Sequence, residues 1–171
     1  MKIVLVGYMG SGKSIIGELL SEKSSLEFID LDSEIEKVEK KSIKLIFAQK
    51  GEVYFRKLEH QVFNQLMQSN QNVIISTGGG TPCYANNHVY LTQNGVISVY
   101  LKASVETLFS RLKNEKTKRP LLQDKTNDEM KEFIAIHLFE RSFFYAKCTS
   151  TIFVDDKTPA EIVYEIEKLI V

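Results

Sequence analysis

Short apolar runs alternate along the chain with longer amphipathic segments. The runs are rich in β-branched residues and are too short for helices, which predicts parallel strands buried on both faces. We expect strands at 2–6, 26–30, 72–76, 96–101 and 151–154. Between them, apolar residues recur three and four positions apart, as on one face of a helix. We expect helices at 15–24, 33–41, 42–50, 52–69, 104–113, 129–147 and 160–169, with a loop and a short helix at 82–94. This alternation predicts an α/β fold.

The segment after the first expected strand reads Gly-Tyr-Met-Gly-Ser-Gly-Lys-Ser from Gly7 to Ser14. It matches G-x-x-x-x-G-K-[ST], the phosphate-binding loop (P-loop) of nucleotide-binding proteins. Gly10 and Gly12 let the main chain approach an anion, and the positive end of the next helix faces the same point. Lys13 would reach the β- and γ-phosphates, and Ser14 would ligate Mg²⁺. The ATP-binding residues expected here are Gly10, Ser11, Gly12, Lys13, Ser14 and Ile15.

Two carboxylates, Asp30 and Asp32, stand at the end of the second expected strand. In extended chain they point the same way, toward the crevice beyond the carboxyl ends of the strands. A carboxylate there can orient a substrate hydroxyl and take its proton, or hold Mg²⁺ through water. The third strand ends in Ser76 and Thr77 rather than in an aspartate, so Asp30 and Asp32 are the acidic metal-site candidates. Asp32 is equally placed to cap a helix beginning at Ser33.

Two further segments are candidates for ligand contact. Gly78, Gly79 and Gly80 follow a buried strand and would offer backbone amides that no side chain covers. Residues 114–128 are polar, and Pro120 disfavours a helix at Arg119. So long a segment between two helices suits a lid that excludes water, with Arg119 bringing charge to a transferring phosphoryl group. The alternative is a solvated loop.

Composition narrows the choice of partners. The chain has 171 residues, enough for one domain, and its 22 basic residues balance its 22 acidic residues. We therefore expect no nucleic-acid partner and no membrane partner. No apolar run could span a bilayer and no signal peptide is evident. Cys83 and Cys148 lack metal-site spacing, which indicates reduced thiols in a cytoplasmic protein.

Arginine is scarce in this chain, because 18 of the 22 basic residues are lysines. Arginine is required where a flat bidentate fork must hold a carboxylate or a phosphate. Biased codon usage is the alternative explanation. Taken alone, Arg56 is better explained by a surface salt bridge to Glu52 or Glu59. The four arginines are Arg56, Arg111, Arg119 and Arg141.

Six motifs, in this order and spacing, resemble those of the shikimate kinase family over essentially the whole chain. They are residues 7–14; 28–32 with Ile35 and Glu36; 51–52 with Phe55, Arg56 and Glu59; 78–80; 119–122; and Arg141 with Tyr145. The resemblance implies a three-layer, nucleoside-monophosphate-kinase-like P-loop kinase fold. Its parallel sheet would have five strands in the order 2-3-1-4-5, with helices on both faces and a mobile lid. One domain would span 1–171, with a shikimate-binding region at about 32–60 and a lid at about 114–128.

The resemblance also implies transfer of the γ-phosphate of ATP to the 3-hydroxyl of shikimate, on the pathway to chorismate and the aromatic amino acids. ATP and shikimate would be the small-molecule partners, with Mg²⁺ accompanying ATP, and we expect a monomer. The alternatives are another small-molecule P-loop kinase, such as a gluconate kinase, or a nucleotide-binding switch that transfers no phosphate to a small acceptor.

Residue roles follow from the resemblance position by position. Asp32 would contact the reacting hydroxyl, and Arg56 and Arg141 would grip the substrate carboxylate, which explains why they are arginines. The Gly79 amide, between Gly78 and Gly80, would contact the ring. Lys13, Asp32 and Arg119 would be catalytic, with Arg119 on the ATP phosphates. Near the adenine the family commonly has an arginine where this chain has Lys157, so either Lys157 or Arg111 would contact the base.

Overall fold

A single parallel sheet organises the protein. The computed structural model describes residues 1–118 and 122–170. Within these residues, five strands pair in the order β2-β3-β1-β4-β5, which confirms the expected topology. The strands are β1 (Lys2–Val6), β2 (Glu27–Asp30), β3 (Val73–Ser76), β4 (Val96–Lys102) and β5 (Ser150–Phe153). Because β1 lies between β3 and β4, the P-loop after β1 emerges beside the glycine turn after β3.

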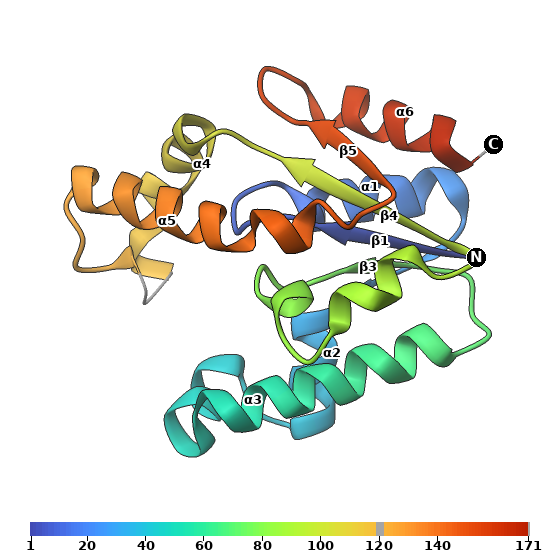
Figure 1. Ribbon diagram of the computed structural model, residues 1–171, viewed down its shortest axis with the longest axis horizontal. Coiled ribbons are helices and arrows are strands. Elements are labelled where there is room, and N and C mark those ends of the chain that lie inside the picture. The colour runs from blue at the N-terminus through green and yellow to red at the C-terminus, as the bar shows by residue number, and fades with distance from the viewer. Residues whose placement is uncertain (119–121, 171) are drawn as a thin grey trace.

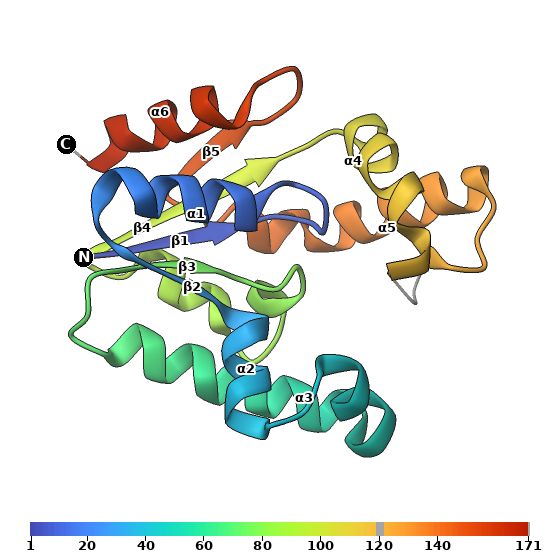
Figure 2. The same ribbon diagram turned by 180° about the vertical axis from the view of Figure 1, so that it is seen from behind.

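Helices cover both faces of this sheet. On one face α1 packs beside α6, and on the other lie α5 and the two 3₁₀ turns η1 and η2 (Figures 1 and 2). Helices α2 and α3 pack on each other beyond the β2–β3 side. The helices are α1 (Lys13–Ser24), α2 (Leu31–Glu39), α3 (Ile43–Gln68), α4 (Val105–Leu112), α5 (Asn127–Tyr145) and α6 (Pro159–Ile170), with 3₁₀ turns η1 (Thr81–Cys83), η2 (Asn87–Thr92) and η3 (Lys113–Lys118). None of the helices in the described ranges is long and apolar enough to cross a membrane.

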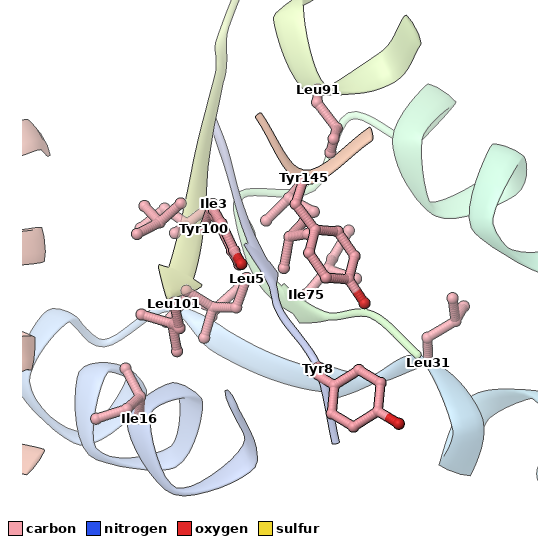
Figure 3. Close-up of a cluster of buried hydrophobic side chains, with 14 of the residues drawn as sticks. Ile3, Leu5, Tyr8, Ile16, Leu31, Ile75, Leu91, Tyr100, Leu101 and Tyr145 are labelled. Atoms are coloured by element: carbon pink, nitrogen blue, oxygen red, sulfur yellow. The ribbon is translucent and has the colours of Figure 1, made fainter. Parts of the chain in front are cut away.

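The core lies on both sides of the central strands. Every residue of β1 and β3 is buried, as expected for strands covered on both faces. Ile16 of α1 lies on one side of the sheet, while Leu91 of η2 and Tyr145 of α5 lie on the other (Figure 3). The Tyr145 ring packs against Tyr100 of β4, with 5.0 Å between ring centroids. Each fully buried side chain of this kind contributes about 1.5–3 kcal/mol, so the sheet is a rigid base for the loops at its edge.

The structure moves several expected boundaries. Gly51 interrupts α3 with φ 78° and ψ 175°, so the expected helix end at Gly51 is confirmed although the two helices form one bent element. Helix α5 begins two residues before the expected position, because Thr126 and Glu129 form a capping box. The short helix expected within 82–94 is 3₁₀ rather than α. The lid expected at 114–128 includes part of η3 and the start of α5, and its residues 119–121 lie outside the described part of the chain.

Candidate active site

The P-loop wraps a concave stretch of main chain around the start of α1. Gly12 is the N-cap of α1 with φ 101°, and Gly10 has φ 82°, so both positions need the freedom of glycine as predicted. The amides of the first turn of α1 therefore point outward from a positive helix end. The Lys13 ammonium curls back over the loop and donates to the carbonyls of Gly7 (2.8 Å) and Tyr8 (3.1 Å). The backbone amides of the loop and the Lys13 ammonium thus lie together at the start of α1, where an anion such as a phosphate group would bind.

A cleft of about 700 Å³ opens beyond the carboxyl ends of β1, β2 and β3. Its wall joins segments far apart in the sequence: the P-loop, the acids after β2, the glycine turn after β3, Arg111 of α4 and the start of α6. The lining residues are Met9, Gly10, Ser11, Gly12, Lys13, Ser14, Ile15, Ile16, Asp30, Asp32, Ser76, Thr77, Gly78, Gly79, Arg111, Glu115, Lys157, Pro159 and Ile162. The expected P-loop residues and both acids therefore share one cleft.

The two acids at the end of β2 and the start of α2 have different positions from those expected. Asp30, not Asp32, is the N-cap of α2, because its Oδ1 accepts from the Ser33 amide at 3.1 Å. The prediction that Asp32 caps a helix was wrong, and so was the extended geometry assumed for the pair. The helix begins at Leu31, so Asp32 lies in its first turn. Ser14 Oγ donates to Asp30 Oδ2 at 3.4 Å, which joins the P-loop to β2.

Asp32 has the electrostatics of a proton acceptor. Burial in the cleft wall, followed by the negative charges of Asp30 and Glu59, raises its pKa to about 6, although Lys13 lowers it. The residue as a whole is exposed on the open side of the cleft, so it is the packing on the protein side of its carboxyl group that desolvates it. A carboxylate with a pKa near 6 is ionised at neutral pH, yet it is a stronger base than a solvated aspartate. Asp32 can therefore take a proton from a hydroxyl group brought beside it.

Arg56 is held in the wall of the site rather than on the surface. Its Nη1 donates to Glu59 Oε2 at 2.8 Å, and Glu59 is 1% exposed. Glu52 lies 3.5 Å from Nε, and the guanidinium stacks over the Tyr84 ring, with Cζ 4.1 Å from the centroid. The salt-bridge partners expected from the sequence, Glu52 and Glu59, are correct. The expected location was wrong, because the Arg56 side chain is mostly buried rather than on the surface. A guanidinium fixed by Glu59 and Tyr84 can keep one edge free to grip an anion.

The glycine turn brings the second arginine to the same place. A methyl group on Gly80 would meet the Arg56 guanidinium at 2.8 Å, and one on Gly79 would meet Arg141 Nη1 at 3.3 Å. Arg141 comes from α5 and also lies over the Tyr8 ring, with Cζ 5.4 Å from the centroid. Two guanidinium groups, one from α3 and one from α5, therefore occupy the space where side chains on two adjacent glycines would lie. A side chain at Gly80 would displace the Arg56 guanidinium, and one at Gly79 would press on that of Arg141.

The remaining cleft residues lie around the P-loop and α6. Arg111 donates to the carbonyls of Gly10 (3.0 Å) and Ser11 (3.2 Å), so α4 braces the P-loop. Lys157 lines the cleft and pairs with Glu165 at 2.6 Å. Arg119 lies outside the described residues. Sequence reasoning did not identify Glu115, Pro159 or Ile162 as cleft residues, because only the fold brings η3 and α6 to the P-loop.

The donor set of the cleft matches the needs of a hard cation that keeps most of its water. In the described parts of the chain, no three acidic, histidine or cysteine side chains gather into a metal cluster. The hydroxyl of Ser14 and the carboxylates of Asp30 and Asp32 offer oxygen ligands beside the P-loop. Mg²⁺ is commonly held by one or two such groups together with water and phosphate oxygens, so the residues present fit it.

Comparison with known proteins relates this geometry to a family. The sequence profile described as shikimate kinase matches residues 9–171. The chain belongs to the shikimate kinase family. It is 56% identical over 169 residues to the shikimate kinase of Flavobacterium psychrophilum, with 99% of this chain and 98% of the relative covered. As a member of this family it is a phosphotransferase enzyme that uses ATP.

Solved structures of the family share the fold along its length. The crystal structure of shikimate kinase from Bacteroides thetaiotaomicron superimposes with a TM-score of 0.91 at 34% identity, covering 99% of this chain and 98% of that chain. Shikimate kinase from Acinetobacter baumannii, in complex with shikimate, superimposes with a TM-score of 0.88 at 35% identity, covering 99% and 92%. The three-layer kinase fold predicted from the motifs is therefore confirmed.

Proposed function

We propose that this protein transfers the γ-phosphate of ATP to the 3-hydroxyl of shikimate, giving shikimate 3-phosphate and ADP in the chorismate pathway. The observation that carries the proposal is the pair Arg56 and Arg141 beside Gly80 and Gly79, in the turn whose Gly78 and Gly79 line the cleft with Asp32 and the P-loop. An acceptor with a carboxylate needs such forks, whereas a neutral sugar does not. Family membership supports the same acceptor.

The donor half of the reaction belongs to the P-loop. The amides of Gly10, Ser11, Gly12 and Ile15 cradle the phosphates at the positive end of α1. Lys13 leaves the carbonyls of its own loop and moves to the β- and γ-phosphates, where it stabilises charge on the transferring group. Arg119 on the proposed lid, about 114–128, adds positive charge to the transferring phosphoryl group. Lys157 or Arg111 contacts the adenine.

The acceptor half is the region from about 32 to 60 together with the glycine turn and α5. Arg56 and Arg141 bind the shikimate carboxylate, and the amide of Gly79, between Gly78 and Gly80, contacts the ring. Held in this way, the 3-hydroxyl lies at Asp32, which orients it and takes its proton during an in-line transfer. The pKa near 6 supports this role, because Asp32 is charged at the pH of most cells.

Mg²⁺ accompanies ATP in the proposed reaction. Ser14 would ligate it directly, Asp30 would hold it through water, and Asp32 would contribute weakly. When bound, the ion neutralises phosphate oxygens. Asp30 already accepts a hydrogen bond from Ser14, so this chain holds its oxygen donors together beside the P-loop. We further propose a cytoplasmic monomer with one domain over 1–171.

One coupled assay separates the proposal from its alternatives. Purified protein with ATP and Mg²⁺ is given shikimate, gluconate or a nucleoside monophosphate, and ADP release is followed. Of the three acceptors, we expect only shikimate to give rapid, saturable ADP release. Release with gluconate or a nucleotide would make the protein another P-loop kinase. ATP binding without acceptor-dependent release would make it a nucleotide-binding switch. Either of these outcomes refutes the proposal.

A further inference from the structure

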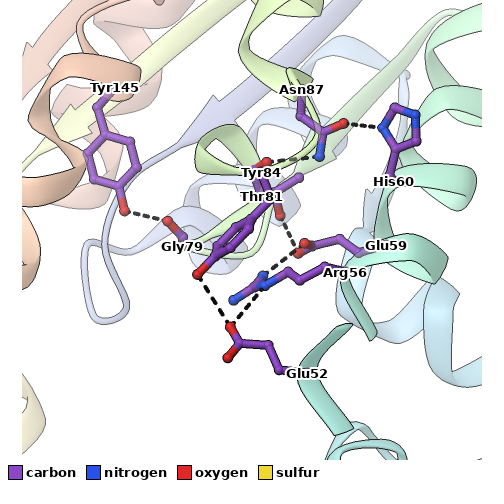
Figure 4. Close-up of polar contacts among 9 residues, drawn as sticks. All are labelled: Glu52, Arg56, Glu59, His60, Gly79, Thr81, Tyr84, Asn87 and Tyr145. Carbon is purple, nitrogen blue, oxygen red and sulfur yellow. Dashed lines mark hydrogen bonds and ion pairs between the residues drawn. The ribbon is translucent and has the colours of Figure 1, made fainter. Parts of the chain in front are cut away.

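A chain of buried and part-buried hydrogen bonds starts at Arg56 of α3, passes through η1 and η2, and returns to α3 at His60 (Figure 4). Thr81 Oγ1 donates to Glu59 Oε1 at 2.7 Å, while the other oxygen of Glu59 holds Arg56 at 2.8 Å. Asn87 Nδ2 donates to the Thr81 carbonyl at 2.9 Å, and Asn87 Oδ1 lies 2.7 Å from His60 Nδ1. Thr81 and Asn87 are 0% exposed and Glu59 is 1% exposed. This network contacts no expected substrate atom, yet it holds a residue that does.

The direction of each hydrogen bond in the network is fixed. A carboxylate only accepts, so the Thr81 hydroxyl must donate to Glu59. A carbonyl also only accepts, so Asn87 presents its amino group to Thr81 and its oxygen to His60. His60 Nδ1 therefore carries the proton. A buried carboxylate is costly unless both of its oxygens are bonded, so Thr81 satisfies the oxygen that Arg56 leaves free and helps to hold Glu59 in place beneath Arg56.

A second hydroxyl holds the same turn from the opposite side. Tyr145 Oη donates to the Gly79 carbonyl at 2.6 Å, and Tyr145 is fully buried (Figure 4). Tyr145 follows Arg141 by four residues on α5, so the two side chains share one face of that helix. The bond therefore fixes the helix that carries Arg141 to the glycine beside it. Tyr145 is part of the family motif, but the reaction as proposed leaves it without a role.

The turn between these two hydroxyls is tightly closed. The Thr81 amide bonds to the Gly78 carbonyl at 3.1 Å. A methyl group on Gly78 would lie 3.0 Å from Thr81 Oγ1, 3.2 Å from Glu59 Oε1 and 3.3 Å from Asp32 Oδ1. Three oxygens therefore surround one glycine. We call Arg56 and Arg141 together the carboxylate clamp. A displacement of the turn would move the clamp and the surroundings of Asp32 at the same time.

We propose that the hydroxyls of Thr81 and Tyr145 are positioning groups, which hold turn 78–81 between α3 and α5 and so set the separation of Arg56 and Arg141. Neither touches substrate. Thr81 acts through Glu59 on Arg56, and Tyr145 acts through Gly79 on the helix of Arg141. The inference rests on the proposed function, because its consequence is recognition of the acceptor carboxylate.

The test removes each hydroxyl without changing the shape of the side chain. Thr81→Val and Tyr145→Phe are compared with Thr81→Ser, which keeps the hydroxyl, and with Tyr90→Phe. Tyr90 bonds to Asn64 at 2.5 Å away from the clamp, so its variant loses a comparable bond without consequence for the site. Each protein is assayed for the KM of shikimate, the KM of ATP, kcat and Tm. The methyl ester of shikimate, which lacks the negative charge, serves as a second acceptor. The ratio of kcat/KM for shikimate to kcat/KM for the ester measures how much recognition depends on the carboxylate.

We expect Thr81→Val to raise the KM of shikimate about five- to tenfold and Tyr145→Phe about threefold, as for one lost hydrogen bond each. The KM of ATP should stay within about twofold, and the preference for shikimate over its ester should fall. Thr81→Ser and Tyr90→Phe should resemble the wild type. An unchanged ester preference in the folded Thr81→Val and Tyr145→Phe variants would overturn the inference, as would equal rises in both KM values. If Thr81→Val does not fold, Tyr145→Phe alone decides by the same readouts. A wild-type enzyme without shikimate-dependent ADP release would refute the proposed function instead.

Discussion

Substituting alanine for Gly80 tests whether the position of Arg56 controls acceptor binding. The added methyl group would lie 2.8, 2.9 and 3.0 Å from Nη2, Nη1 and Cζ of Arg56. Carbon and nitrogen atoms pack comfortably at about 3.5–4.0 Å, so the guanidinium must move by roughly 0.5–1 Å. Gly80 has φ −91° and ψ −16°, which alanine adopts without strain. The substitution is therefore a purely steric displacement of Arg56.

The expected magnitude follows from what the displaced guanidinium loses. A hydrogen bond to a charged group contributes about 1.5–3 kcal/mol. Loss of one bond to the acceptor carboxylate should lower kcat/KM for shikimate about 10- to 100-fold, mainly through KM. The KM of ATP should change little, because the P-loop contacts α1 and α4 rather than Gly80. The midpoint of thermal unfolding should fall by only a few degrees.

Steady-state kinetics with a double-mutant cycle provide the measurement. Gly80→Ala is made in the wild type and in Arg56→Lys, whose side chain lacks the guanidinium that the methyl group meets. If the methyl group acts through Arg56, its penalty should shrink strongly in the lysine background. Equal penalties in both backgrounds, or an unchanged KM for shikimate in Gly80→Ala, would refute the reasoning.

Five other perturbations have outcomes that the structure and the proposed roles determine. Turnover should decline as the pH drops through about 6, because protonated Asp32 cannot accept a proton, and a limb near pH 4 in the kcat profile would contradict this. The pKa of Asp32 in the folded protein lies above its usual value of 3.8, so the ionised side chain opposes folding. Asp32→Asn should therefore raise the Tm above pH 6 but not below about pH 4. Gly17→Ala should destabilise by about 1–3 kcal/mol in urea unfolding despite better helix propensity, because its methyl group would meet the Phe28 ring at 2.2 Å; a stabilised variant would disprove the clash. Lys13→Ala should lower kcat by orders of magnitude with Tm preserved, and Arg141→Lys should mainly raise the KM of shikimate; near-normal kinetics would remove either residue from its role.

Local patterns predicted the strands and the P-loop because each depends on neighbouring residues. The apolar run of β1, the angles of Gly10 and Gly12 and the break at Gly51 are all of this kind. The helix cap was misassigned for an equally local reason. Asp30 and Asp32 are both good caps, and the choice depends on where β2 stops, which one sequence does not fix.

Contacts between distant segments could not be predicted from spacing. The Thr81 hydroxyl meets Glu59 across 22 residues, and Arg111 meets the P-loop carbonyls across about 100. Nothing in the sequence distinguishes Thr81 from a solvated threonine in a turn. Arg56 was identified as functional only through the family motif, because its burial depends on α3 packing beside η1.

The order of the strands separates the two halves of the enzyme along the chain. Residues 27–92 are contiguous and include β2 and β3, the two strands on one flank of β1. They hold Asp32, Arg56 and the glycine turn, whereas β4 and β5 lie on the other flank. Acceptor preference can therefore diverge by exchange of one contiguous piece, while the nucleotide machinery is inherited unchanged. Arg141 is one exception, since it comes from α5, and Asp30 is another, since it lies in the 27–92 stretch but bonds to Ser14 of the P-loop. A chimera that takes residues 27–92 from a kinase with another acceptor must therefore also change Arg141, near the end of α5.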